Sequence, residues 1–409
     1  MHYLVTSILL LASTYSSVGV SQQSRVEQTQ QSPEFSQCIQ RLSDRARAEG
    51  FREPLIEQTL GQVQEIKRVI ALDKKQPEFT QSFSAYLYGR VNEQRIRRGR
   101  ELYQQYQPLL KQLTAEYGIP GQYLIAFWGL ETNYGGYLGK MPIIDSLATL
   151  ACDARRSEFF SQELMLSLQL MDEYGYDLDK MKGSWAGAMG NTQFMPSTYV
   201  KYARDGDGNG KVDLWKSIPD ALTSSANFLN GLGWQEQERW GREVILPSGF
   251  NYQLAGRQQT MTVAEWGAMG MVMANGQKLP AIEHINATLL VPAGHQGPAF
   301  LLYDNFEIIM KWNRSEFYAL SVGHLADRIV GGYDLTQRPS AKAVVKVSEV
   351  EGLQQRLTDL GFDTNGVDGV MGPGTRAAVS RFQAEQGLIA DGFPSEAVFS
   401  RLAELDAEQ

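Results

Sequence analysis

An almost wholly apolar segment that holds one carboxylate constrains this chain more than any other feature. Between residues 119 and 136 the only charged residue is Glu131. Pro120 suits the first turn of a helix, where a missing N–H costs nothing, and Gly135-Gly136 predicts the helix end. A helix of this composition is buried on most sides, so we expect Glu131 to lie largely inside the protein.

The predicted surroundings of Glu131 favour its neutral form. Phe127 and Trp128 lie four and three positions before it, on the same helix face. A carboxyl group held against aromatic carbon loses solvation, which favours the protonated state, and glycosidases build such surroundings for a general acid. Alternatively, Glu131 caps the helix or pairs with an arginine. The segment by itself does not separate these interpretations.

Length and charge limit the class of protein. A chain of 409 residues that is 43% hydrophobic and 21% charged is typical of a globular protein with two or three domains. The net charge of −8 leaves no general basic surface, so we expect no nucleic-acid partner. A neutral or zwitterionic polymer such as a polysaccharide is compatible with this charge.

The first twenty residues read as a secretory signal peptide. Residues 3–20 are apolar or small, and a Gln/Ser-rich stretch follows. This apolar core is short for a transmembrane helix, and no other stretch approaches spanning length. We therefore predict export, with an uncleaved N-terminal anchor as the alternative. Residues 21–33 have almost no apolar content and are predicted to form a disordered spacer.

The chain has two cysteines, Cys38 and Cys152. In an exported protein such a pair favours a disulfide between the N-terminal helices and the core; two buried free thiols are the alternative. Neither cysteine has a histidine at catalytic or metal-ligand spacing, so a cysteine nucleophile is not expected.

The remaining pattern predicts a mainly α protein with a small inserted β-sheet and a separate C-terminal module. Helical periodicity dominates residues 34–335, interrupted by short β-type runs such as those near 289–291 and 300–303. Residues 336–346 lack periodicity and are predicted to be a linker. Residues 347–405 have the length and pattern of a compact three-helix module.

A second segment, residues 183–199, is rich in glycine and alanine. Small residues let a backbone approach a ligand closely, and Ser184 and Gln193 carry groups that can bond sugar hydroxyls or an N-acetyl group. Trp185 and Tyr199 offer stacking surfaces. Close packing between helices is an equally good explanation of the glycines and alanines.

The motifs GLETNYG (129–135) and AGAMGNTQFMPS (186–197) together closely resemble the membrane-bound lytic transglycosylase B family, whose members cleave bacterial peptidoglycan. The pairs Asp368-Gly369, Gly372-Pro373 and Phe382-Gln383 resemble a peptidoglycan-binding domain. The resemblance implies a lysozyme-like catalytic domain at 34–335, a wall-binding domain at 347–405, peptidoglycan strands as the partner and a periplasmic location. We expect a monomer.

The resemblance also implies a mechanism that needs one carboxylate and no cofactor. Glu131 would protonate the oxygen between N-acetylmuramic acid and N-acetylglucosamine, then accept the proton of the muramic 6-hydroxyl, which gives a 1,6-anhydro product. The alternatives are a muramidase that hydrolyses the same bond and an inactive wall-binding scaffold. Asp145 and Asp153 follow in sequence, and either one could be a second carboxylate.

The positions that match the family's substrate contacts are polar or aromatic: Ser184, Gln193, Arg155, Arg156, Asn313, Tyr318 and Tyr86. Two positions depart from the family pattern. Phe159 and Trp312 stand where tyrosine is usual, which predicts that stacking is kept and a hydroxyl hydrogen bond is lost.

A third segment, residues 205–213, resembles the first half of an EF-hand loop. The expected calcium ligands are Asp205, Asp207, Asn209, Lys211, Asp213 and, further along, Asp220. The twelfth position is Lys216 and not glutamate, which rules out a full EF-hand. The same family has an atypical calcium loop at this place, so we expect a structural Ca²⁺; a metal-free turn is the alternative.

Overall fold

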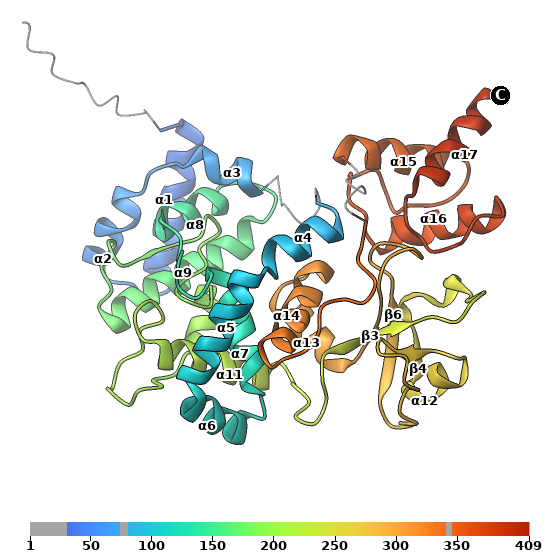
Figure 1. Cartoon of the computed structure of the whole chain (residues 1–409). Helices are drawn as coiled ribbons and strands as arrows, with labels where there is room; N and C mark the ends of the chain where they lie inside the picture. Colours follow the sequence, from blue (N-terminus) through green and yellow to red (C-terminus); the bar gives the residue numbers. More distant parts are fainter. Residues whose placement is uncertain (1–30, 74–80, 341–345, 409) are drawn as a thin grey trace, which may run out of the picture.

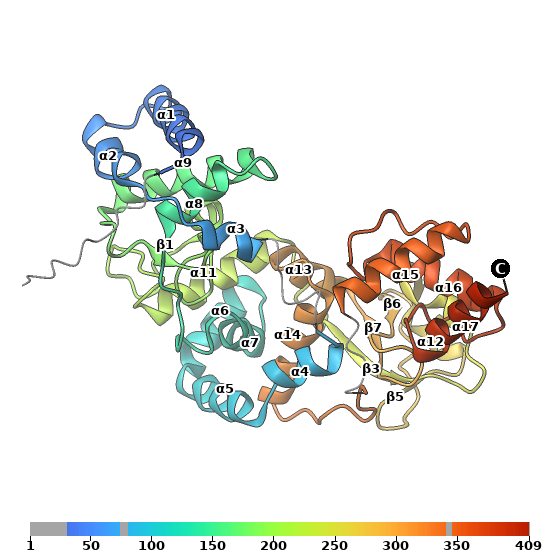
Figure 2. The ribbon, with the colours of Figure 1, turned by 90° about the horizontal axis from the view of Figure 1, so that it is seen from above.

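The computed structural model describes residues 31–73, 81–340 and 346–408. The predicted signal peptide lies outside the described residues, as do most of the predicted spacer and residues 341–345 of the predicted linker. The prediction of a mainly α fold with a small sheet is confirmed. Figures 1 and 2 show an N-terminal helical unit at one end, a central helical unit, and a sheet beside the C-terminal helices at the other end.

The N-terminal unit has its own apolar core, built from helices of both the first and the middle part of the chain. Its elements are α1 (Pro33–Ala48), α2 (Glu53–Gln58), η1 (Leu60–Gln62), α3 (Lys67–Asp73), α8 (Ile143–Ala151), α9 (Ser157–Tyr174) and α10 (Pro196–Tyr202). A disulfide joins Cys38 on α1 to Cys152 at the end of α8, as predicted, and closes a sequence separation of 114 residues.

The central unit forms the second core and surrounds the apolar segment. Its elements are α4 (Phe83–Arg90), α5 (Glu93–Gln105), α6 (Gln107–Tyr117), α7 (Gly121–Thr132), α11 (Ile218–Gly231), α13 (Asp304–Trp312) and α14 (Glu316–Ile329). Helix α7 is buried between α5, α6, α11 and α14.

Helix α7 ends earlier than predicted. It stops at Thr132 because Asn133 and Tyr134 already adopt left-handed backbone conformations, with φ of 52° and 60°. The prediction that Gly135-Gly136 ends the helix is wrong by about one turn. Glu131 therefore lies at the last turn of α7, where the helix meets the loops of the N-terminal unit.

The predicted small sheet is present and is larger than expected. Its five antiparallel strands follow the order β4-β6-β7-β3-β5. They are β3 (Gly241–Ile245), β4 (Gly256–Thr262), β5 (Val272–Met273), β6 (Asn286–Leu290) and β7 (Ala299–Leu302), with η3 (Tyr252–Leu254) and α12 (Val263–Ala268) beside them. A separate pair, β1 (Met141–Pro142) and β2 (Lys182–Gly183), joins the loops near Glu131.

The C-terminal module contains α15 (Val347–Asp359), α16 (Pro373–Glu385) and α17 (Glu396–Ala407) around one apolar core. Two buried glutamines hold its two Asp-Gly turns in the same way: Gln354 bonds the turn at Asp368, and Gln383 bonds the turn at Asp391. The module lies against the sheet and the start of α14 (Figure 1), because Arg376 pairs with Glu316 at 2.6 Å.

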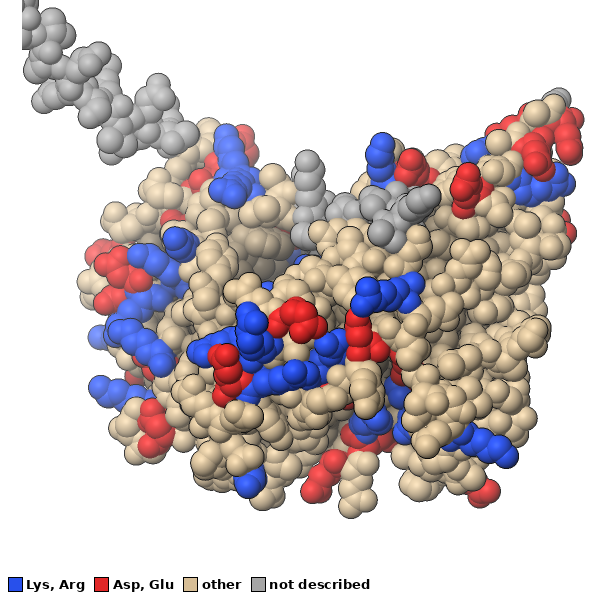
Figure 3. Space-filling model, viewed as in Figure 1, with Lys and Arg blue, Asp and Glu red and all other residues tan. Residues whose placement is uncertain are grey.

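Positive and negative side chains are interspersed on the face drawn in Figure 3, most densely at its centre. No described helix is long and apolar enough to cross a membrane.

Candidate active site

The site is organised around the carboxyl group of Glu131. Its Oε1 accepts hydrogen bonds from the indole Nε1 of Trp312, at 3.0 Å, and from the hydroxyl of Tyr318. Trp312 ends α13 and Tyr318 lies in the first turn of α14, so the junction of these helices brings both donors to α7. Burial raises the pKa of Glu131 to about 7, and the two hydrogen bonds partly oppose this rise.

Both donors bind the same oxygen of Glu131. Among the described residues, Oε2 has no hydrogen-bond partner. In the protonated state Oε1 is therefore the acceptor, and Oε2 carries the proton that can be transferred. Glu131 as a whole keeps part of its surface exposed.

Trp312 has a donor of its own. The change from tyrosine predicted the loss of a hydroxyl hydrogen bond, and the indole N–H supplies a hydrogen bond to Glu131. The ring also packs on Phe127, with centroids 4.3 Å apart, and lies 5.6 Å from Phe194. Trp312 thus joins the acid to the aromatic core and to the glycine- and alanine-rich loop. Phe159, the other departure, is 47% exposed on α9.

Replacing Trp312 by phenylalanine should move the basic limb of the pH–rate profile to higher pH. The variant loses one donor to the carboxylate, so the pKa of Glu131 rises further, by about one unit. The protonated acid then persists to higher pH. Trp312→Tyr, which restores a donor, is the matched control and should keep the wild-type limb. Equal limbs in wild type and Trp312→Phe would show that the indole N–H has no effect on the acid.

The glycine- and alanine-rich loop is fixed against α7 by a buried asparagine that the sequence analysis missed. Asn191 accepts a hydrogen bond from Trp128 Nε1 at 2.9 Å and donates to the carbonyl groups of Leu214 and Trp215. Its own carbonyl accepts from the Thr132 hydroxyl at 2.7 Å. A buried amide with these partners positions the loop beside Glu131. Asn191 lies within the motif at residues 186–197, and nothing else in the sequence indicated this role.

The glycines of this loop pack against protein. A Cβ at Gly183 would lie 2.1 Å from the Ala188 carbonyl oxygen, and one at Gly190 would lie 2.6 Å from the Leu214 carbonyl oxygen. Close packing therefore accounts for these glycines. Tyr199 is 1% exposed and bonds Tyr176, so the expectation that it stacks on a ligand is wrong.

Ser184, Gln193 and Asn313 keep polar groups available. The Ser184 oxygen accepts from the N–H groups of Ala186 and Ala188, which leaves its proton to donate. Gln193 has a left-handed φ of 52°, and its amide nitrogen bonds two backbone carbonyls, which leaves its oxygen as an acceptor. The Asn313 oxygen accepts from the Ser315 N–H and leaves its NH₂ group. Two donors and an acceptor of this kind suit hydroxyl and acetamido groups.

Tyr318 and Tyr86 lie close together. Tyr318 contacts Glu131, and Tyr86 is among the groups that raise the pKa of Tyr318, after burial and Glu131. The Tyr86 ring is 3% exposed and lies under the guanidinium group of Arg90, 3.5 Å from the ring centre.

Arg155 and Arg156 have a different environment. Both pair with the buried Asp73 of the N-terminal unit. These contacts engage one side of each guanidinium group, and both arginine side chains stay partly exposed. A role for the arginines in substrate binding stays a prediction.

Neither candidate for a second carboxylate acts on Glu131. Asp145 accepts a hydrogen bond from the Gln64 N–H at 2.5 Å, and Asp153 accepts from the Arg155 N–H. Burial and the two hydrogen bonds are the causes of the Glu131 pKa shift, and no carboxylate is among them. Within the described chain, Glu131 titrates without an acidic neighbour.

The predicted calcium loop gathers carboxylates. Single oxygens of Asp205, Asp207 and Asp220 lie within 4.8 Å of one another. Backbone N–H bonds, the one from Gly210 first, lower the pKa of Asp205. Asn209 and Asp213 bond nearby N–H groups of the backbone, and Lys211 could offer only its carbonyl. Hard oxygen donors in this arrangement fit Ca²⁺.

Taken together, the helical fold and a single carboxyl group with a raised pKa define an enzyme of the lysozyme-like class. Comparison with known proteins is more specific. Residues 34–327 match the transglycosylase SLT domain family, and residues 346–402 match a family of peptidoglycan binding domains. The chain therefore belongs to the transglycosylase SLT family and is an enzyme of the lytic murein transglycosylase kind.

Individual relatives agree with this assignment. The chain is similar to SltB3 from Pseudomonas aeruginosa, solved in complex with NAG-NAM-pentapeptide, with 40% identity and a TM-score of 0.86 over 91% of this chain and all of the other. It is 29% identical to membrane-bound lytic murein transglycosylase B of Escherichia coli (strain K12) over 73% of this chain and 82% of the relative. Slt35 of Escherichia coli, solved in complex with calcium, is 29% identical with a TM-score of 0.62, over 73% of this chain and 93% of the other.

Proposed function

We propose that this protein cleaves the β-1,4 bond between N-acetylmuramic acid and N-acetylglucosamine in peptidoglycan without water and leaves 1,6-anhydro ends. The observation that carries the proposal is Glu131: one carboxyl group with a pKa raised to about 7, held by two donors on one oxygen, with no acidic partner among the residues that the structure describes. A glycosidase that hydrolyses its substrate normally needs two carboxylates.

In the proposed reaction Glu131 acts twice. Its Oε2 first donates a proton to the leaving glycosidic oxygen, and the substrate's 2-acetamido group stabilises the cationic centre. The same oxygen then accepts the proton of the muramic 6-hydroxyl as that hydroxyl attacks the anomeric carbon. An internal nucleophile has a high effective concentration. Ser184, Gln193 and Asn313, with Tyr86 and Tyr318, would hold the sugars.

Product analysis tests this function. Peptidoglycan digested with the full-length enzyme should release muropeptides that lack one water relative to hydrolysis products, as measured by mass spectrometry. Reducing ends would show a muramidase. No release at all would show a wall-binding scaffold.

We propose the domain limits 34–335 and 347–405, a monomer, and action in the periplasm after removal of residues 1–20. A curated relative is named as membrane-bound, and the peptidoglycan substrate itself lies outside the cytoplasm.

We also propose that Asp205, Asp207 and Asp220 hold a structural Ca²⁺, supported by their convergence and by the calcium complex of Slt35. Chelation should then lower the melting temperature. Calcium at about a hundred times its Kd contributes about 3 kcal/mol of stability. Calorimetry with chelator and with restored Ca²⁺ measures this, and Asp207→Asn should lose the response. A melting temperature that calcium leaves unchanged would mean a metal-free turn.

A further inference from the structure

The two donors that hold Glu131 come from two different helices. Trp312 is the last residue of α13, and Tyr318 lies in the first turn of α14. Only residues 313–315 connect these helices. The position of both donors at Oε1 therefore depends on how the end of α13 and the start of α14 are held, and a displacement of either one would weaken a hydrogen bond to the acid.

One arginine of the sheet joins both helices. Arg257 on β4 donates two hydrogen bonds to Glu307 in the first turn of α13, one of them 2.9 Å long. Its Nη1 also lies 3.5 Å from Oε1 of Glu316, the first residue of α14. A guanidinium group presents its donors in a rigid plane, so it fixes the distance between the two carboxylates. The two helices are thus linked a second time, away from their short connection.

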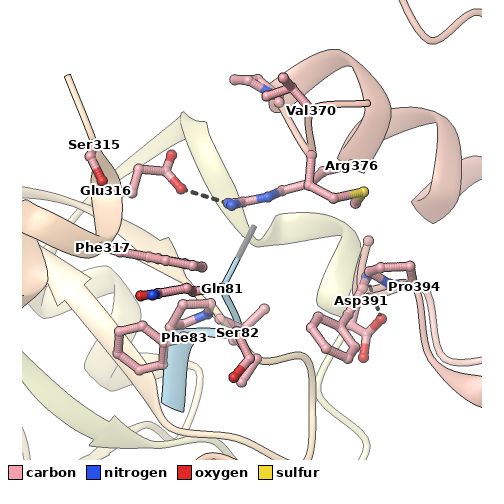
Figure 4. A pocket seen from close by; sticks show the side chains of 18 of the residues that line it. Gln81, Ser82, Phe83, Ser315, Glu316, Phe317, Val370, Arg376, Asp391 and Pro394 are labelled. Carbon is pink, nitrogen blue, oxygen red and sulfur yellow. Dashed lines mark hydrogen bonds and ion pairs between the residues drawn. The ribbon is translucent and has the colours of Figure 1, made fainter. Parts of the chain in front are cut away.

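A second arginine, from the C-terminal module, completes this network. Nη1 of Arg376 on α16 binds Oε2 of Glu316 at 2.6 Å (Figure 4). The Glu316 side chain is only 14% exposed. Burial raises the pKa of Glu316, but the two arginines outweigh it and hold the pKa below its usual value. Loss of either arginine would leave a buried carboxylate with half of its partners, which is costly, so we expect the first turn of α14 to shift.

The first turn of α14 connects these ion pairs to the acid. Glu316 pairs with the two arginines. Phe317 packs on Phe83 of α4, with ring centroids 5.3 Å apart. Tyr318 donates to Glu131. A cavity of about 320 Å³ lies beside the turn, between the catalytic unit and the module (Figure 4). Because packed side chains do not fill this space, dispersion contacts there are few, and the ion pairs matter more for the position of the turn.

We propose that Arg257 and Arg376 are positioning residues: they hold the end of α13 and the start of α14 so that both donors reach Glu131. The inference rests on the proposed function, because it takes Glu131 as the acid. It gives the C-terminal module a second role, since one of its side chains then supports the acid. The arginines act through position. Burial and the two hydrogen bonds are the causes of the Glu131 pKa shift, and neither arginine is among them.

The pH dependence of kcat/KM tests the proposal, because it reports the pKa of the acid in the free enzyme. A soluble NAG-NAM oligosaccharide as substrate removes any need for attachment to insoluble wall. In full-length Arg376→Met the bond from Tyr318 weakens, so the basic limb should move to higher pH by about half a unit. Arg257→Met loosens both donors and should move the limb by about one unit. Arg381→Met is the matched control: this arginine of α16 bonds the Asp363 carbonyl inside the module, and the limb should stay in place.

A second substitution shows whether Arg376 acts through Tyr318. In Tyr318→Phe the donor is already absent, so adding Arg376→Met should move the basic limb no further. Arg376→Lys keeps a positive charge near Glu316 and should lie closer to wild type than Arg376→Met. If a methionine variant is unfolded at the assay temperature, Glu316→Gln replaces it. That variant removes the buried charge together with its pairs, and its limb should also move to higher pH.

Two results would overturn the positioning role. A shift of the same size when Arg376→Met is added to Tyr318→Phe would mean that the lost charge acts on Glu131 directly. Coincident limbs for wild type, Arg257→Met and Arg376→Met would leave the module as an attachment only. The proposed function survives both results, because it fails only if the wild-type products lack anhydro ends.

Discussion

Glu131→Gln should release almost no muropeptides from peptidoglycan that wild type digests completely. Glutamine keeps the shape and can accept the hydrogen bonds of Trp312 and Tyr318, but it can neither donate nor accept the transferred proton. Loss of general acid and base action costs about 10²- to 10⁴-fold in rate. Quantified release of anhydro-muropeptides over time measures the loss.

Asp145→Asn is the control for this experiment. Asp145 is a second partly buried carboxylate whose pKa burial raises, and removing its charge should leave turnover within about twofold of wild type. A large loss in Asp145→Asn would show that two carboxylates act and would favour hydrolysis.

Glu131→Gln should also be more stable than wild type at pH 8. The pKa of Glu131 is about 7 in the folded protein and near its ordinary value of 4.5 in the unfolded chain. The folded state therefore binds the proton more tightly, and this contribution to stability is lost as the pH rises through 7. Glutamine never ionises, so Glu131→Gln should gain roughly 3 kcal/mol at pH 8 and little at pH 4.

Removing the disulfide should have the largest effect on stability. Cys38→Ala with Cys152→Ala opens a loop closed over 114 residues, and loop-closure entropy predicts a loss of about 4–5 kcal/mol in the free energy of unfolding. Chemical denaturation of the oxidised proteins measures it. The double variant should keep its turnover well below its melting temperature, because the hydrogen bonds that hold Glu131 come from Trp312 and Tyr318 and involve neither cysteine.

Reduction provides the control. A thiol reductant should destabilise wild type to the level of the double variant and leave the double variant unchanged. If wild type and the double variant unfold at the same denaturant concentration, the link between α1 and α8 contributes nothing measurable.

Local patterns were enough to predict the acid but not its partners. An apolar run with one carboxylate predicts burial of Glu131, because composition alone decides whether a helix faces water. Trp312 and Tyr318 lie 181 and 187 residues further along the chain. Only the packing of α13 and α14 on α7 brings them to Oε1, and no local periodicity encodes that meeting.

In the sheet too, some strands can be predicted from their own residues, and others form only through pairing with neighbours that are distant in sequence. Strands β6 and β7 are rich in apolar residues and were predicted, whereas β4 (GRQQTMT) is polar and partly exposed, and β5 has two residues. Pairing with neighbours makes β4 and β5 strands. The attachment of the C-terminal module was likewise not predicted, because Arg376 and Glu316 look like ordinary surface charges in the sequence.

That attachment has a consequence for how a strand is handled. The ion pair of Arg376 with Glu316 and the hydrogen bond between His295 and Asp391 fix the C-terminal module on the body that carries Glu131. A flexible linker alone would let the module bind at one place on the polymer while the catalytic unit cleaves at an unrelated distance from it. A fixed attachment holds the proposed wall-binding module at a constant distance from Glu131. We therefore expect each cleavage to occur at a set spacing from the place where the module binds the wall.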